Sequence, residues 1–406
     1  MTDLATRAAP PGTAALRRAA PALLGYAAVR ALGLVVLALW SAARGRSAYT
    51  LLTARWDSLW YARVAGLGYG YEVRLPNGDV HSNLAFFPLL PWLERLLHAV
   101  TPLSYAGAGF AVALVSSLAA AWGIFAVADR LYGPRAGVCA VLLWAALPVG
   151  VVQSMAYSES LFTALAAWSL YAVLAGRWPA AGSLALLAGL TRPVGLAVAA
   201  AVWAAAAASF VRNGSVSGPH GARDTAHAPH RGDSPPPGGA TVRQRALGML
   251  LAPLGAAGYV LWVGRHTGRG PLGYLDVQAG WRNGFDGGYA FARFVAGRFT
   301  SLPSALAGVG LIAGVVLVGL LYGACVRQRQ PLPLLVYAGA VTALALCASG
   351  YFGSKPRLLM PAFPLLLPLA VALARLRPSR SALVVGGVAA ASAVYGAFWL
   401  NGSGPP

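Results

Sequence analysis

Long apolar runs separated by short polar segments dominate this 406-residue chain. A helix needs roughly 17 to 25 consecutive apolar residues to cross a hydrocarbon layer about 30 Å thick. About ten runs approach this length. They lie near residues 21–40, 106–128, 136–152, 160–175, 180–210, 246–263, 303–325, 332–350, 358–374 and 382–400. The pattern predicts an all-α polytopic membrane protein, a bundle of about 10–11 transmembrane helices.

The polar segments divide the chain into parts. We expect a cytoplasmic tail at 1–20, a transmembrane module at 21–210 with a long, structured outer loop at 41–105, a linker at 211–245, a second transmembrane block at 246–400 and a tail at 401–406. The linker is rich in Gly, Pro, Ser and His and has no apolar period, which predicts a disordered cytoplasmic connector. Its His220, His227 and His230 lack neighbouring cysteines or clustered carboxylates, so a metal site is not indicated.

The amino-acid composition indicates which classes of molecule the chain binds. With 58% apolar residues and 10% charged residues, the chain has lipid as its main solvent. Its net charge of +20 would suggest nucleic acid in a soluble protein. Here the arginines gather in short loops, where they orient helices and meet anionic lipid head groups, so membrane lipids are the expected partners and nucleic acid is not.

The three cysteines do not indicate a metal or cofactor site. Cys139, Cys325 and Cys347 are odd in number, lie in or beside apolar runs and show no ligand spacing. No cofactor is predicted, and the question of a divalent metal stays open. Abundant alanine, and arginine in place of lysine, suggest a GC-rich bacterial genome and hence a bacterial plasma membrane.

Short basic loops set the expected orientation. Arg17 and Arg18, the segment 129–135, the segment 327–329 and the segment 375–377 belong on the cytoplasmic side by the positive-inside rule. The N-terminus is then cytoplasmic. The segments expected on the extracytoplasmic side of the membrane are 41–105, 153–159, 264–302, 351–357 and the C-terminal tail.

Because each span moves the chain to the other side of the membrane, the assigned sides limit how often the run 180–210 can cross. Arg177 before it and the basic linker after it share one side, so the run crosses twice or not at all. Thr191-Arg192-Pro193 interrupts it, and proline cannot continue a helical hydrogen-bond ladder. We expect two short helices that meet at Arg192 within the membrane, as is tolerated around protein or a wet cavity.

The first outer loop carries the densest candidate chemistry. Only 11 residues of the chain are acidic, and one of them, Asp57, lies in Arg55-Trp-Asp-Ser-Leu-Trp-Tyr61 just after the first apolar run. Trp and Tyr favour the membrane interface, so a short interfacial helix is expected there, ended by glycines at 66, 68 and 70. One alternative stays open, an aromatic anchor in which Asp57 caps a helix or pairs with Arg55.

Four segments of the chain follow one another in the same order as the motifs of a known protein family. They are Arg55-Trp-Asp-Ser-Leu-Trp-Tyr61, Ala85-Phe-Phe-Pro-Leu-Leu-Pro91, Tyr157-Ser-Glu-Ser-Leu-Phe162 and Thr191-Arg-Pro-Val-Gly195. In these the chain resembles the PIG-V family, the GPI mannosyltransferase 2 group, and its bacterial relatives. A fifth segment, Ser354 to Pro364, looks like the closing motif of many GT-C glycosyltransferases.

The resemblance implies a GT-C fold and a polyprenyl-phosphate sugar donor, typically of mannose. It also implies an acidic residue of the first outer loop at the catalytic centre, and Asp57 is the residue that matches. The stretch 73–83 and the linker depart from the eukaryotic pattern, which argues against a GPI acceptor.

An inverting glycosyl transfer requires a carboxylate to take the acceptor's proton and a cation to stabilise the departing phosphate. Asp57 can be the base. Arg357 and Lys355 are the candidates for the phosphate, beside Arg55, although interfacial arginines are also common as anchors.

Three further residues are candidates with open alternatives. Glu159 either caps a helix or lines the substrate cavity. Arg192 either contacts substrate or pairs with a cavity carboxylate, because a guanidinium at membrane depth is costly otherwise. His81 is a possible second acid/base or sugar contact. Arg30, within the first span, is expected to reach the cytoplasmic surface.

The sequence therefore favours a membrane glycosyltransferase, in the narrower expectation a mannosyltransferase, whose site faces outside. Its acceptor, whether lipid, glycan or protein, stays open. A transporter or flippase of a lipid-linked sugar is the main alternative, but transporters commonly have repeated interruptions and no second half echoes Thr191-Arg-Pro193. A scaffold protein would leave the polar first loop unexplained.

Overall fold

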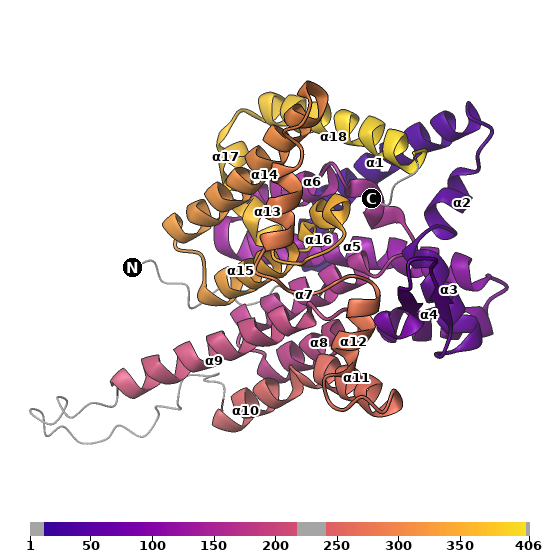
Figure 1. Ribbon diagram of the computed structural model, residues 1–406. Coiled ribbons are helices and arrows are strands. Elements are labelled where there is room, and N and C mark those ends of the chain that lie inside the picture. The colour runs from indigo at the N-terminus through magenta and orange to yellow at the C-terminus, as the bar shows by residue number, and fades with distance from the viewer. Residues whose placement is uncertain (1–11, 217–240, 403–406) are drawn as a thin grey trace, which may run out of the picture.

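Helices make up most of the computed structural model, which describes residues 12–216 and 241–402 (Figure 1). Five helical stretches are long and apolar enough to cross a membrane. They are α1 (Gly12–Ala42), α5 (Tyr105–Tyr132), α10 (Val242–Leu251) with α11 (Leu254–His266), α14 (Leu302–Arg327) and α18 (Pro378–Leu400). The prediction of an all-α polytopic membrane protein is confirmed.

Shorter apolar helices fill the rest of the bundle. They are α6 (Pro134–Ala145), α7 (Glu159–Leu174), α8 (Trp178–Gly189), α9 (Gly195–Val216) and α15 (Leu332–Leu346). A bend of 75° separates α16 (Lys355–Leu359) from the segment that contains α17 (Leu367–Arg375). At about 1.5 Å of rise per residue, apolar stretches of 10 to 17 residues, among them Gly195–Phe210 of α9, fall short of a 30 Å layer.

Several predicted spans are therefore wrong as single helices. The run 136–152 is α-helical only to Ala145 and continues as a turn of 3₁₀-helix at Gly150–Ser154. The run 358–374 is broken by the bend after Leu359. Hydropathy reports apolar composition rather than backbone continuity, so it joined segments that the structure keeps apart.

The break predicted at Arg192 is confirmed. α8 ends at Gly189 and α9 begins at Gly195, and the two helices pack against each other. α8 also packs on α10 and α11 through glycines: a Cβ added to Gly255 would lie 1.9 Å from the carbonyl oxygen of Leu186. Small residues at such contacts let helix backbones approach closely in a membrane.

The core is built from alanines and a few large side chains. Trp144 is fully buried, stacks on Tyr26 with ring centroids 5.6 Å apart and donates from Nε1 to the carbonyl of Met360 at 3.1 Å. These contacts join α1, α6 and the bent segment. α18 also lies along α1, so the last helix packs against the first (Figure 1).

The first outer loop is structured, as predicted. It contains α2 (Ala48–Thr53), α3 (Asp57–Leu67), strands β1 (Glu72–Arg74) and β2 (Val80–Ser82), and α4 (Leu89–Val100). β1 and β2 pair antiparallel, with Val73 opposite His81. α3 ends where Gly68 adopts a φ of 81°, a conformation that glycine tolerates best.

The segment 264–302 meets this loop, through α12 (Gly273–Gly280) and the turn after it; α13 (Tyr289–Ala296) follows. Trp281 donates from Nε1 to the carbonyl of Ser82 at 3.0 Å, and Arg282 pairs with Asp79 at 2.5 Å. Two segments predicted to share the outer side thus lie together.

The basic loops lie together as well. Arg18 donates to Asp129 at 2.7 Å, and Arg135 donates to the carbonyl of Leu376. The prediction for Arg30 is wrong: it is buried and donates to the carbonyls of Gly150 and Ala145. Because α6 stops at Ala145, its last carbonyls need donors, and Arg30 supplies one for the carbonyl of Ala145.

The predicted boundaries of the polar segments shift. α1 begins at Gly12, inside the predicted tail 1–20, and α9 and α10 extend into both ends of the predicted linker 211–245. The rest of that linker, with His220, His227 and His230, lies outside the described residues, as do most of the predicted tails.

The orientation of the bundle stays a prediction and can be tested by labelling. In a chain whose native cysteines are replaced, Asn77→Cys in the exposed turn between β1 and β2 should react with an impermeant maleimide on intact cells. Gln328→Cys, exposed after α14, should react only after permeabilisation. The reverse pattern would place the N-terminus outside.

Candidate functional site

Asp57 occupies the first position of α3, where the positive end of the helix dipole favours a carboxylate. Trp56 before it has a φ of 49°, a conformation that costs a non-glycine residue free energy. The turn is held by Ser58, whose Oγ donates to the Arg55 carbonyl at 2.6 Å and accepts from the Arg55 amide at 3.0 Å. The strained turn therefore fixes where Asp57 projects.

Glu159 begins α7 on the neighbouring side of the site. Its side chain is only 1% exposed, whereas that of Asp57 is 28% exposed. Next to it, the Ser158 hydroxyl bonds the hydroxyl of Tyr61 at 2.7 Å, which ties α7 to α3. Of the two carboxylates, Asp57 is the one that a solute can reach.

Arg192 lies in the break between α8 and α9 and forms an ion pair with Glu159. The alternative of a paired guanidinium, left open by the sequence, is the arrangement found. Breaking the helix at this point lets the side chain meet a buried carboxylate, without which a cation at this depth would be costly.

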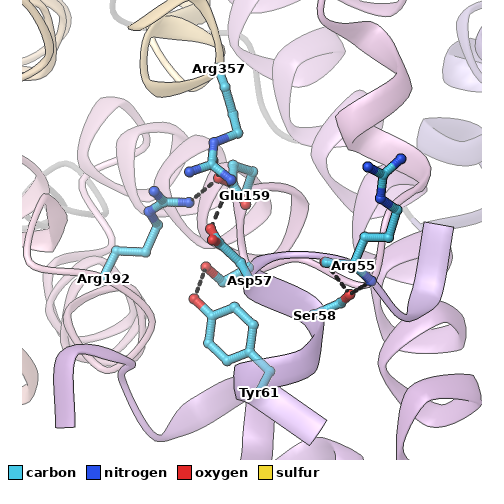
Figure 2. Close-up of polar contacts among 8 residues, drawn as sticks. Arg55, Asp57, Ser58, Tyr61, Glu159, Arg192 and Arg357 are labelled. Carbon is cyan, nitrogen blue, oxygen red and sulfur yellow. Dashed lines mark hydrogen bonds and ion pairs between the residues drawn. The ribbon is translucent and has the colours of Figure 1, made fainter. Parts of the chain in front are cut away.

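Arg357 joins the two carboxylates (Figure 2). Its Nη1 lies 2.7 Å from Oδ2 of Asp57, and its Nε lies 3.4 Å from Oε1 of Glu159. Its guanidinium lies over the ring of Tyr157, 5.1 Å from the ring centroid. Among the described residues neither ion pair uses Nη2, so this group is available for another ligand.

The result is a chain of alternating charges, Asp57–Arg357–Glu159–Arg192. Two carboxylates balance two guanidiniums. Its members come from α3, α16, α7 and the α8–α9 break, so one network ties four parts of the bundle together. Glu159 contacts both arginines and is its buried centre.

Neutralising that centre should destabilise the protein. Glu159→Gln would leave Arg192 without its carboxylate and Arg357 with Asp57 alone, and removing one partner of a buried ion pair costs about 3–5 kcal/mol. We expect a lower midpoint of thermal unfolding in detergent. The double variant Glu159→Gln with Arg192→Gln restores charge balance and should recover part of the loss; an additive loss would contradict the coupling.

Two predicted phosphate ligands point elsewhere. Lys355 donates from Nζ to the carbonyls of Ala345, Leu346 and Ala348, at 2.9 to 3.2 Å, and so caps the end of α15. Arg55 donates to the carbonyls of Leu400 and Gly402 beyond the end of α18, and its guanidinium points away from Asp57 (Figure 2).

His81 lies in β2 of the first loop and is not part of the ion-pair network. Its ring stacks on Trp281 with centroids 4.0 Å apart, and burial lowers its pKa, while Asp79 opposes that shift. Trp281 in turn meets Trp60 edge-on, with centroids 4.9 Å apart. A neutral, stacked imidazole suits a contact surface better than a charged one.

Sequence reasoning missed several of these contacts. Tyr61, Ser158 and Tyr157 stood inside the quoted motifs, but no role was assigned to them; burial raises the pKa of Tyr61, whose hydroxyl shares a hydrogen bond with that of Ser158. Trp281 lies in a segment without any motif. Across the described residues no cluster of three or more His, Cys, Asp or Glu side chains is placed to hold a metal ion.

Solved structures provide a comparison for the fold. ArnT from Cupriavidus metallidurans bound to undecaprenyl phosphate matches with a TM-score of 0.50 and 16% identity, over 89% of this chain and 63% of ArnT. Its apo state matches at 0.49 and 18% identity, over 87% of this chain and 60% of that one. The archaeal oligosaccharyltransferase AglB from Archaeoglobus fulgidus, in complex with an inhibitory peptide and a dolichol-phosphate, matches at 0.45 and 12% identity, over 94% of this chain and 56% of AglB.

The ArnT match shows that the chain shares the fold of ArnT. The chain spans less than two thirds of the length of ArnT. No protein-family model and no curated protein sequence matches the chain. The resemblance to the PIG-V family therefore stays a prediction.

Proposed function

We propose that the chain is a membrane glycosyltransferase that moves a sugar from a polyprenyl-phosphate donor to an extracytoplasmic acceptor, with inversion at the anomeric carbon. The observation that supports this most is the pair Asp57–Arg357, a reachable carboxylate held 2.7 Å from a guanidinium beside a second buried ion pair. The fold shared with ArnT, whose structure contains undecaprenyl phosphate, is consistent with such a donor.

The reaction needs both members of the pair. Oδ2 of Asp57 accepts from Arg357, so Oδ1 takes the proton of the acceptor hydroxyl. The hydroxyl oxygen attacks C1 of the sugar, and the bond from C1 to the phosphate oxygen breaks. The electron pair leaves with the phosphate, which Arg357 binds through Nη2 as its charge grows.

The same contact couples the two steps. A donor phosphate at Nη2 binds the same guanidinium whose Nη1 holds Asp57, so one arginine sets the positions of both the base and the departing phosphate. Glu159 keeps Arg357 in place meanwhile, because it contacts the other edge of the guanidinium. Arg192 compensates the charge of Glu159 and serves as a positioning residue.

The finer assignments belong to the proposal as well. Mannose as the sugar, membership of the PIG-V family and a bacterial plasma membrane with the site facing outside rest on the sequence resemblance, the arginine-rich composition and the basic loops. The acceptor is a lipid, glycan or protein hydroxyl. His81 and Trp281 form an aromatic surface near the site that suits a sugar ring of donor or acceptor.

Proteoliposomes separate this proposal from a transporter of lipid-linked sugar. Purified protein is reconstituted with a membrane-lipid extract as acceptor source and with a polyprenyl-phosphate donor carrying radiolabelled mannose in the outer leaflet. A transferase converts the donor to free polyprenyl phosphate and labelled product. Translocation of intact donor to the inner leaflet, with no conversion, would favour the transporter and overturn the proposal.

A further inference from the structure

An apolar groove runs along the face shared by α1 and α18. Its volume is about 560 Å³, and it is lined by Trp40, Ala390, Ala391, Val394, Tyr395 and Phe398. Trp40 and Phe398 meet edge-on across it, with ring centroids 6.5 Å apart. The groove therefore offers an almost wholly apolar surface to a chain-like ligand.

A basic cavity adjoins the same two helices near their ends. It has a volume of about 570 Å³ and is lined by Arg46, Leu51, Arg55, Asn401 and Gly402. On α18, Val394 and Phe398 line the groove, and Asn401 and Gly402 follow them by one helical turn in the basic cavity. On the other side, Arg44 lies over the groove residue Trp40, 5.6 Å from its ring centroid.

The two arginines of the cavity are held in place by backbone carbonyls. Arg46 donates from Nη1 to the carbonyl of Asn401 at 2.6 Å, and Arg55 donates from Nη1 to that of Leu400 at 2.6 Å. Carbonyls at a helix end carry only partial negative charge. They orient the guanidiniums without neutralising them.

No carboxylate of the described residues forms an ion pair with either arginine, whereas four other arginines there have such partners. The carbonyls at the end of α18 account for the positions of both arginines, but they leave two like charges close together, and like charges repel. Two fixed, uncompensated guanidiniums match an anion that accepts from both, and phosphate oxygens fit this geometry best.

The geometry points to a second lipid site, in which a lipid with a phosphate monoester head group places its phosphate at Arg46 and Arg55 and its hydrocarbon tail in the groove along α18. A monoester carries up to two negative charges, enough for both arginines, whereas a phosphodiester carries one. The site is separate from the Asp57–Arg357 pair, because the guanidinium of Arg55 points away from Asp57 (Figure 2). It does not depend on the proposed catalytic activity.

Native mass spectrometry of the full chain tests the site by counting bound lipids. With polyprenyl monophosphate as the probe, the double variant Arg46→Gln with Arg55→Gln should lose one bound lipid, through a fall in affinity of about tenfold or more. Ala391→Trp, which fills the groove and leaves both arginines intact, should lose the same lipid. Phosphatidylglycerol and inorganic phosphate should not displace it at equal concentration.

Arg95→Gln is the matched control, because Arg95 also donates to helix-end carbonyls, those of Val64 and Ala65, but at α3. It should keep the full lipid count. Unchanged stoichiometry in both the double variant and Ala391→Trp would overturn the inference, as would equal displacement by phosphatidylglycerol. Since the readout counts lipids, failure of the proposed transferase activity would leave this result unaffected.

Discussion

Asp57→Asn should lower the turnover of sugar transfer by roughly 10² to 10⁴ while the protein still inserts and binds donor. Asparagine keeps the size of aspartate and still accepts the hydrogen bond from Arg357, which lies 2.7 Å from Oδ2 in the native protein. It cannot take a proton from an acceptor hydroxyl. The measurement is the steady-state rate of labelled product formation by purified protein, with donor binding measured separately.

The chain offers a matched control for this variant. Asp79 also lies in the first outer loop and pairs with an arginine, Arg282, at 2.5 Å, but outside the network of Asp57. Asp79→Asn should leave turnover unchanged within a few fold. Near-normal transfer by Asp57→Asn would rule out Asp57 as the base and leave it as a partner of Arg357 at the start of α3.

Arg357→Ala should slow transfer by on the order of 10² or more, because the guanidinium meets charge that develops on the departing phosphate. It also removes the contact that holds Asp57 and Glu159 together. Arg357→Lys retains the charge but not the planar geometry, and should recover only part of the rate. Rates and donor affinity are measured on protein that elutes as a single species.

Arg282→Ala controls for the loss of an arginine outside the network, since Arg282 is 67% exposed and pairs only with Asp79 among the described carboxylates. It should transfer at close to the native rate. If Arg357→Ala transferred sugar as fast as Arg282→Ala, Arg357 would be an interfacial anchor, and the phosphate contact would have to be sought elsewhere.

The helical architecture could be predicted because long apolar runs are typical of helices in a membrane. The break at Arg192 could be predicted too, because Pro193 forbids a continuous helix. The 75° bend after Leu359 carries the same signal, because Pro361 and Pro364 lie at it, but the apolar composition of the run 358–374 led to the prediction of a single span.

The members of the site were identifiable singly, but their pairing was not. Asp57 and Arg357 are 300 residues apart, and nothing local in the sequence links them. The presence of a basic residue also does not say which group its side chain will contact. Arg30, Arg55 and Lys355 all donate to helix-end carbonyls, which any free backbone oxygen can attract and no sequence pattern marks.

The stereochemistry of the labelled product tests the central claim most directly. Purified protein is incubated with a polyprenyl-phosphate mannose donor of known anomeric configuration and with a membrane-lipid extract as acceptor source, and the product is digested with α- or β-specific mannosidase. We expect product of the opposite configuration from the native protein and almost none from Asp57→Asn. Product that retains the donor's configuration, or donor that stays intact under every condition, would contradict an inverting transfer with Asp57 as its base.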